Sequence, residues 1–189
     1  MLKRFWQVLF PSALVLAVLF SSPAAAQILP SSSQLLGNPG FENGSANPAP
    51  WVPTVGVIDD SPGEPPHSGH WKAWLDGYGT THTDTLYQQV TIPATVTIAT
   101  LSFWIHIDSA ETTTTIPFDI LRVQIRDPSN AVLATLATYS NLNKGLGFNP
   151  KTFNLNAFIG QTIRVYLVGA ENASLQTSFV VDDFALNVQ

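Results

Sequence analysis

The sequence predicts an all-β fold, a two-sheet antiparallel β-sandwich of the jelly-roll type. Segments in which apolar and polar residues alternate recur from residue 71 onward, and this period of two marks strands with one buried face. Turn residues separate these segments, and none of them shows a helical period. Charged residues make up only 11% of the chain, and the richness in Thr, Ser and β-branched residues is typical of β domains. The long, unequal loops make an up-and-down barrel the less favoured alternative.

The first 26 residues predict a secretory signal peptide. Lys3 and Arg4 form a positive start, residues 8–20 are almost wholly apolar, and three alanines precede Gln27, which fits the rule for signal cleavage. The apolar run is shorter than the roughly 20 residues of a spanning helix, so a retained anchor is the less favoured alternative. We therefore expect a protein that is secreted or held in the cell envelope, with no membrane contact after cleavage.

The rest of the chain divides into a short linker, residues 27–34, and one domain, residues 35–189, of ordinary domain size. Two of the eight basic residues lie in the leader, so the remainder carries six basic and thirteen acidic residues, a net charge of −7. This balance argues against a nucleic-acid partner, which requires clustered Lys and Arg. The chain has no cysteine, so core burial or a metal ion must stabilise the domain.

The domain begins with loops. Residues 38–50 are rich in Asn, Pro and Gly, and residues 60–69 contain three prolines, which exclude a central strand. Residues 71–76 alternate as a strand that ends at a Gly-Tyr-Gly turn. A second strand is expected at 86–92, because Pro93 ends the alternation.

Residues 97–108 form the clearest strand, with four large apolar side chains on one face and polar or aromatic ones on the other. The threonine-rich segment 110–117 is expected to be an exposed loop or edge. Residues 121–126 and 131–139 are expected to pair as a hairpin, because the turn 127–130 carries Pro at its second position, as type I turns prefer.

The last third contributes three more strands, at residues 151–155, 162–168 and 178–187, after a Gly- and Asn-rich loop at 141–150. Gly160 marks a turn between the first two of them. The total of about eight to ten strands suits a sandwich of two sheets.

Two carboxylates stand in the last apolar strand. In regular alternation Asp182 shares a face with Phe184, and Asp183 takes the other face, so one carboxylate must lie among apolar neighbours. This is costly unless the group is paired or binds a cation. Calcium accepts carboxylate and carbonyl oxygens, and Glu42, the backbone near Asn38, and Asp182 or Asp183 would supply them if the two ends of the domain meet. The alternative is a carboxylate that is capped by backbone N–H groups or protonated.

Several motifs together resemble the galactose-binding-like jelly roll, which includes carbohydrate-binding modules and accessory domains of secreted bacterial glycosidases and peptidases. The resemblance covers residues 35–188 and rests on the segments NPGFENG, LSFWIHI, GQTIRVYLVG and TSFVVDDFAL. Three further segments are similar to domains appended to secreted bacterial peptidases: DTLYQQVTIP, TLATYSNLN and SLQTSFVVDDFAL. The resemblance implies a structural calcium ion bound by Glu42 and by Asp182 or Asp183.

Four aromatic residues are candidate contacts for a sugar: Trp71, Trp74, Tyr78 and Trp104. Sugar sites use aromatic rings as platforms with a few polar groups for orientation. Trp71 and Trp74 lie on opposite faces of one regular strand, so one core cannot hold both. The alternative is that the sandwich and its loops bury most of these rings.

No enzyme signature is present: the chain has no GxSxG elbow, HExxH motif, phosphate loop or cysteine nucleophile. Asp76, Asp84 and Asp108 are the acidic residues that a glycosidase pair would need, but their positions do not predict the required separation. We therefore expect no catalytic residues. The sequence favours a secreted binding module with a structural calcium ion, whose partner is a polysaccharide or an extracellular protein. A structural or protein-interaction domain of the cell envelope is the alternative.

Overall fold

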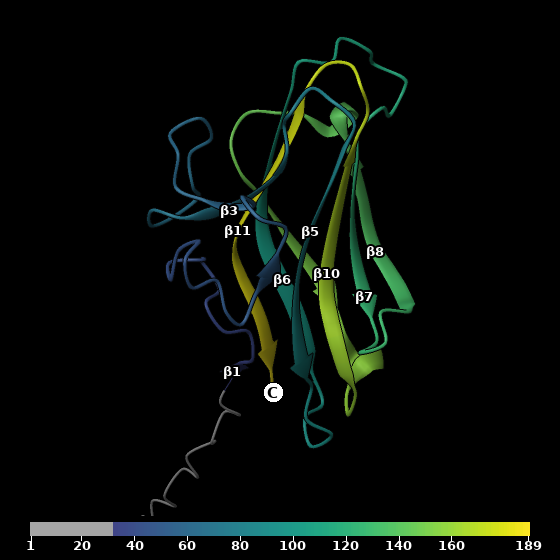
Figure 1. Cartoon of the computed structure of the whole chain (residues 1–189). Helices are drawn as coiled ribbons and strands as arrows, with labels where there is room; N and C mark the ends of the chain where they lie inside the picture. Colours follow the sequence, from purple (N-terminus) through teal and green to yellow (C-terminus); the bar gives the residue numbers. More distant parts are fainter. Residues whose placement is uncertain (1–31) are drawn as a thin grey trace, which may run out of the picture.

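The computed structural model describes residues 32–189, which form two antiparallel sheets that face each other (Figure 1). The all-β sandwich is therefore confirmed. The expected signal peptide and most of the expected linker lie outside the described residues. Within residues 32–189, no helix has the length and apolar character needed to cross a membrane.

The first sheet has six strands and contains the last strand of the chain at its centre. Its order is β3 (Ile58–Asp59), β4 (Lys72–Asp76), β11 (Thr177–Val188), β6 (Ala99–Ser109) and β9 (Asn149–Asn154), with β1 (Ser33–Gln34) also paired to β11.

The second sheet has five strands and lies to the right of the first in Figure 1. Its order is β2 (Val52–Pro53), β5 (His82–Thr91), β10 (Thr162–Glu171), β7 (Ile120–Arg126) and β8 (Val132–Ser140). Two short 3₁₀ helices, η1 (Asn141–Asn143) and η2 (Asn156–Phe158), lie in the connections on either side of β9.

All eight strands expected from alternation are present, with shifted ends. β5 begins at His82, before the expected residue 86, and β10 continues to Glu171. β9 begins at Asn149 and includes Pro150, which an edge strand tolerates because one side of it has no sheet partner. The expected linker is shorter, since Ser33 and Gln34 belong to β1 and pair with the end of β11.

The core between the sheets is apolar and contains a chain of aromatic rings. Phe41 is fully buried, and its ring centroid lies 5.3 Å from that of Trp51 and 6.0 Å from that of Phe184. Phe184 in turn stacks on Phe103 at 4.8 Å. Phe41 therefore anchors the loop that precedes β2 to the centre of the sandwich.

One feature of β11 differs from the expected alternation. The register with β6 shifts between Asp182 and Ala185, and Asp183 has a φ of 49°. This bulge turns Phe184 into the core while Asp182 stays on the opposite side. The expectation that Asp182 and Phe184 share a face was wrong, because a bulge inserts one residue into the period of two.

Candidate functional site

The two ends of the domain meet beside the β11 bulge. The backbone N–H of Phe184 donates to the carbonyl of Pro39 at 3.0 Å. A side chain at Gly40 would place its Cβ 3.3 Å from Oδ1 of Asp183 and 3.8 Å from Oδ1 of Asp182. The segment around Glu42 and the two aspartates therefore lie together, and we call this contact the clasp.

Residues 67–71 supply N–H donors to the clasp. Oε1 of Glu42 accepts the backbone N–H groups of His70 and Trp71, each at 3.0 Å. Oδ2 of Asp182 accepts the N–H groups of His67 and Ser68, at 2.9 and 3.1 Å. Asp182 thus holds the loop 60–69 against the last strand, and Glu42 holds the two residues that follow this loop.

Asp183 binds the same loop through side chains. Its Oδ2 lies 2.6 Å from Nδ1 of His67, and its Oδ1 accepts the hydroxyl of Ser68 at 2.8 Å. Asp182 is fully buried, and this burial raises its pKa to about 6, although hydrogen bonds from Ser68, Asp183 and His67 act in the opposite direction. The bulge therefore presents one buried and one partly exposed carboxylate to the loop.

The oxygens of Asn38 are also engaged. Its carbonyl accepts the indole N–H of Trp51 at 2.9 Å, and its Oδ1 accepts the N–H of Asn43 at 3.1 Å. No three His, Cys, Asp or Glu side chains among residues 32–189 are arranged to hold a metal ion. The donors at the clasp are N–H and O–H groups, so a calcium ion there would displace some of them. Calcium at this position stays a prediction.

Three of the four candidate sugar-binding aromatics line neighbouring hollows at the β3–β4 side of the molecule. Trp71 forms one wall of a hollow of about 600 Å³. Its other lining residues are Ser45, Ala46, Pro48, Pro53, Val55, Gly56, Ile58, Asp59 and Asp60. The indole packs on Gly44, where a Cβ would lie 2.9 Å from the ring, so this glycine allows the wall to form.

A second hollow, of about 290 Å³, lies next to the first and shares Gly56 with it. Trp74, Asp76, Gly77 and Tyr78 complete its lining. Tyr78 is 49% exposed, and His82 packs against its ring with centroids 4.0 Å apart, so a ligand can contact the exposed part of the ring. We call the two hollows together the aromatic groove.

Trp104 does not belong to the aromatic groove. Its indole stacks on the imidazole of His67 with ring centroids 4.0 Å apart, and Phe148 meets His67 edge-on. The loop 60–69 thus crosses the outer face of the first sheet and covers part of this ring. The structure therefore separates Trp104 from the other three candidates.

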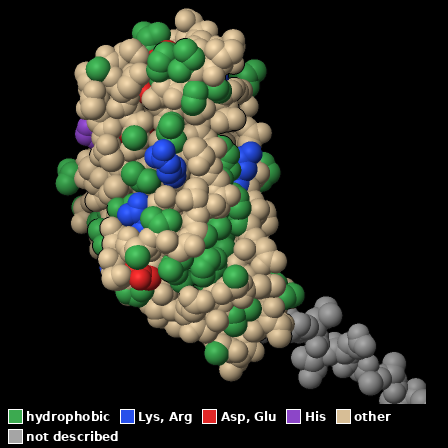
Figure 2. Space-filling view, turned by 90° about the vertical axis from the view of Figure 1, so that its right-hand side faces the viewer, with side chains coloured by type: hydrophobic (Ala, Val, Ile, Leu, Met, Phe, Trp, Pro, Cys, Tyr) green, Lys and Arg blue, Asp and Glu red, His purple; other side chains and the backbone are tan. Residues whose placement is uncertain are grey.

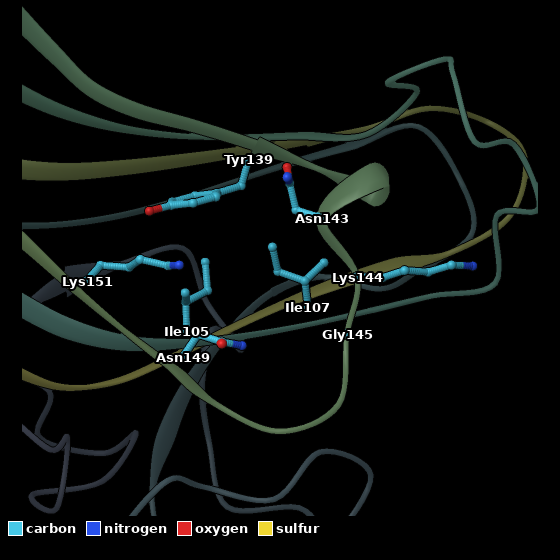
Figure 3. Close-up of a pocket in the computed structure, with 8 residues that line it drawn as sticks. All are labelled: Ile105, Ile107, Tyr139, Asn143, Lys144, Gly145, Asn149 and Lys151. Atoms are coloured by element: carbon cyan, nitrogen blue, oxygen red, sulfur yellow. The ribbon is translucent and has the colours of Figure 1, made fainter.

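A third hollow, of about 320 Å³, opens between β6, β8 and β9 (Figure 3). Its floor is apolar, formed by Ile105 and Ile107, and Tyr139 and Lys151 extend over it from opposite sides. Lys144 points away (Figure 3) and donates to the carbonyls of Ser109 and Glu111. With a single aromatic ring, this hollow offers a smaller platform than the aromatic groove.

The outer face of the second sheet carries a group that the sequence analysis did not single out. Tyr87 and Tyr166 stack with centroids 5.3 Å apart. The guanidinium group of Arg126 lies 3.7 Å from the ring centroid of Tyr166, and that of Arg164 lies 4.9 Å from the ring centroid of Tyr87. The signal was present in the sequence, because Arg164 and Tyr166 alternate with the apolar residues of that strand. The arginines cover ring faces that a sugar would otherwise use.

Neither a family model nor a curated protein matches the chain, whereas solved structures do. The structure of TmCBM61 in complex with β-1,4-galactotriose matches with a TM-score of 0.57 and 19% identity, over 83% of this chain and 99% of that one. The chain has the fold of the β-sandwich carbohydrate-binding modules.

Two further structures share this fold. The K3 cleaved adhesin domain of Lys-gingipain from Porphyromonas gingivalis matches with a TM-score of 0.53 and 16% identity, over 80% of this chain and 98% of that one. The CBM22-1–CBM22-2 tandem domain of Paenibacillus barcinonensis Xyn10C matches with a TM-score of 0.52 and 14% identity, over 86% and 47%. At these identities the likeness establishes the fold, and a ligand has to be argued from the residues of the site.

The acidic residues considered as a glycosidase pair do not form one in this module. Asp84 is fully buried and Asp76 is 4% exposed, and Oδ2 of Asp84 accepts the backbone N–H of Asp76 at 2.9 Å. Asp108 is exposed on β6. A glycosidic bond cannot reach a carboxylate without exposed surface, so the buried pair is not placed for cleavage.

Proposed function

We propose that the chain is a secreted, non-catalytic module that binds a polysaccharide through the aromatic groove. The observation that carries this proposal is that Trp71, Trp74 and Tyr78 line two adjoining hollows with acidic side chains at their rim. The fold of carbohydrate-binding modules, one of which is bound to β-1,4-galactotriose, supports it. The signal peptide expected at residues 1–26 supports secretion.

The aromatic and the polar residues of the groove would have different roles in binding a sugar. The half-exposed ring of Tyr78 and the indole of Trp71 offer apolar faces that can stack on the C–H faces of a pyranose. Asp60 and Ser45 line the same groove, and their oxygens can accept hydrogen bonds from sugar hydroxyls. Asp59 also lines it, but its carboxylate already accepts hydrogen bonds from Ser61 and Lys72. The negative charge beside these rings favours a neutral glycan over an acidic one.

We also propose a structural calcium ion at the clasp. Three carboxylates from distant parts of the chain converge there, and Glu42 and Asp183 are the more exposed of them. In a domain without cysteine, an ion shared by the two ends would take the place of a cross-link. The N–H groups that cap these carboxylates support the alternative, in which the clasp needs no ion.

Binding to glycans provides the test of the proposed function. The protein should be retained on insoluble polysaccharides, and β-1,4-galactooligosaccharides are the first ligands to test in calorimetric titrations. We expect Trp71→Ala and Tyr78→Ala each to weaken binding by about tenfold or more, because a buried aromatic anchor contributes about 1–2 kcal/mol or more. Leu146→Ala is the matched control, because Leu146 is fully exposed and lines none of the three hollows.

The alternative is a protein-interaction domain of the cell envelope, and β8 is the observation that favours it. β8 ends the second sheet, and Val132 and Leu133 on it are 51% and 46% exposed. Figure 2, which looks at the β8 side, shows hydrophobic side chains gathered in a strip with Lys and Arg beside them. Unpaired edge strands invite pairing with another chain. Absence of binding to any glycan, with groove variants that behave as wild type, would support this alternative.

A further inference from the structure

Four acidic side chains are buried together at the end of the sandwich opposite to the C-terminus, at the top of Figure 1. Asp76 ends β4, Asp84 lies near the start of β5, Asp119 precedes β7, and Glu171 ends β10. Asp84 and Asp119 are fully buried, and Asp76 and Glu171 are each 4% exposed. We call these four residues the acidic cluster.

Three members of the acidic cluster have hydrogen-bond donors. Glu171 accepts the backbone N–H groups of Tyr78, Gly79 and Thr177 at 2.8 to 3.1 Å. Asp119 accepts the N–H of Asn172 at 2.9 Å and the hydroxyl of Thr177 at 2.6 Å. These groups hold the ends of β10 and β11 and the loop after β4 together.

Asp84 is the third member that has donors. It accepts the N–H of Asp76 at 2.9 Å and lies 3.1 Å from Nε2 of His82. Its hydrogen bond to the backbone of Asp76 ties the start of β5 to the end of β4.

Asp76 differs from the other three. Both of its carboxylate oxygens are buried and have no hydrogen-bond partner. Its backbone has a φ of 61°, an uncommon conformation for a residue that is not glycine. The carboxylate rests against Gly169, where a Cβ would collide with it. The fold thus makes space between the sheets for a carboxylate and gives it no donor.

The charges of the acidic cluster are not balanced by basic side chains. Among residues 32–189, the only ion pair that involves the cluster joins Asp84 to His82. Burial, and then the charges of Asp84, Glu171 and Asp119, raise the pKa of Asp76 to about 8. Burying an uncompensated carboxylate costs several kcal/mol, so a bound cation or a proton must accompany Asp76 in the folded protein.

The smaller hollow of the aromatic groove reaches this position, since Asp76 lines it together with Trp74, Gly77 and Tyr78. We propose that a hard divalent cation, calcium, binds at Asp76 in the acidic cluster, at a site separate from the clasp. The four side chains of the acidic cluster offer carboxylate oxygens, the ligands that calcium prefers. No three acidic or histidine side chains of residues 32–189 are at metal-ligand spacing, so Asp76 and at most one other carboxylate bind directly. The hollow of about 290 Å³ that Asp76 lines has room for the water that would complete the shell, and the remaining carboxylates would act through their charge.

Calorimetric titration of calcium into the chelator-stripped full chain tests the proposal. The wild type should bind calcium, and Asp76→Asn, which keeps the shape and removes the charge, should weaken binding at this site at least tenfold. Glu42→Gln alters the clasp and leaves the acidic cluster intact, so it is the matched control and should keep this binding. The proposal is overturned if the wild type binds no calcium, or if Asp76→Asn binds it as the wild type does.

A luminescence measurement gives a readout that does not depend on stability. Terbium substitutes for calcium, and Trp74, which lines the hollow beside Asp76, should sensitise its emission. Trp74→Phe should reduce the emission while calcium still competes for the site. If emission is unchanged in Trp74→Phe and is lost only in Glu42→Gln, the ion lies at the clasp and the acidic cluster holds a proton instead. Neither result depends on whether the groove binds a glycan.

Discussion

Gly169 is the residue that makes room for Asp76 in the acidic cluster. It lies on β10 opposite Asp84 of β5, and its missing side chain leaves the space that the carboxylate of Asp76 fills. Any larger residue at this position would push that carboxylate away from the other members of the acidic cluster. A glycine in the middle of a strand often marks such a close approach.

We predict that Gly169→Ala lowers the free energy of unfolding by about 1–3 kcal/mol, the usual cost of overpacking. The added Cβ would collide with the buried carboxylate of Asp76, so this side chain would have to leave the position that it fills beside Gly169. Denaturant unfolding measures the change. Gly145→Ala is the matched control, because a Cβ there meets no atom within 4 Å. Equal midpoints for the two variants would contradict the predicted role of Gly169.

The candidate sugar-binding residues show how far alternation along a strand predicts which side chains are exposed. Alternation indicated correctly that Trp71 and Trp74 cannot share one core, and both remain partly exposed. It could not separate Trp104 from them, because the covering group is His67, which is distant along the chain and reaches Trp104 only through the path of a loop. Loop paths depend on tertiary contacts that a local pattern does not contain.

At the scale of elements, the long strands could be predicted and the short ones could not. Strands of five residues or more, such as β6 and β10, show several alternations each, and alternation is what identifies a half-buried strand. β1, β2 and β3 have two residues each, too few to show a period. They form only because longer strands offer them free edges.

The bulge in β11 is the element that determines the clasp. It gives Asp182 a covered position on the outer side of the sheet and turns Asp183 toward His67 and Ser68. The sequence indicated that one of the two carboxylates must be buried, and Asp182 is. The register shift after Asp182 determines which of the two aspartates is buried, and the apolar pattern of the strand does not predict this shift.

The clasp should respond to pH through Asp182. Burial raises the pKa of this carboxyl from 3.8 to about 6, so the folded protein holds a proton that the unfolded chain has released between these values. Stability from this group is therefore present below pH 4 and is lost as pH rises through 6. In chelator, the stability of the wild type relative to Asp182→Asn should fall by an amount on the order of 2 kcal/mol between pH 4 and pH 7.

Unfolding in urea at each pH measures this difference. Asp182→Asn cannot titrate, so groups shared by both proteins cancel in the comparison. A difference that stays constant, or that grows with pH, would show that the folded pKa of Asp182 is not raised. Asp127→Asn is a suitable second control, because the pKa of the partly exposed Asp127 is lowered by the hydrogen bonds that it accepts from Ser129 and Ala131.

The whole molecule unites residues that no local pattern connects. The members of the acidic cluster are far apart in sequence and meet because β4 and β10 end, and β5 and β7 begin, at the same side of the sandwich. Asp76, Asp84 and Asp108 were candidates for a catalytic pair, and no local pattern predicts that burial removes Asp76 and Asp84 from a substrate. The contact at the clasp could be predicted from the sequence, because both segments that form it, NPGFENG and TSFVVDDFAL, resemble motifs of a known family.

Calcium and pH should act together on the whole fold. Protons compete for the same carboxylates as the ion, and the pKa values of Asp76 and Asp182 are raised to about 8 and about 6. Both groups are mostly protonated in the folded protein at pH 5, so calcium would have to displace a proton there and stabilises the fold little. At pH 8 Asp182 has lost its proton and Asp76 is about half deprotonated, so calcium binds more readily. Calcium at about 100 times its Kd stabilises the fold by about 2.7 kcal/mol, and for a chain of this size this raises Tm by about 5–10 °C.

We therefore predict that a chelator lowers Tm by several degrees at pH 8 and by much less at pH 5. Calorimetric melting curves with calcium and with chelator at both pH values measure the effect. The two sites separate in the variants: Asp76→Asn removes the calcium-dependent shift if the ion lies in the acidic cluster, and Glu42→Gln removes it if the ion lies at the clasp. Melting curves that do not change with calcium at either pH would mean that both sites are stabilised without an ion, the clasp by the N–H donors at Asp182 and the acidic cluster by a proton at Asp76.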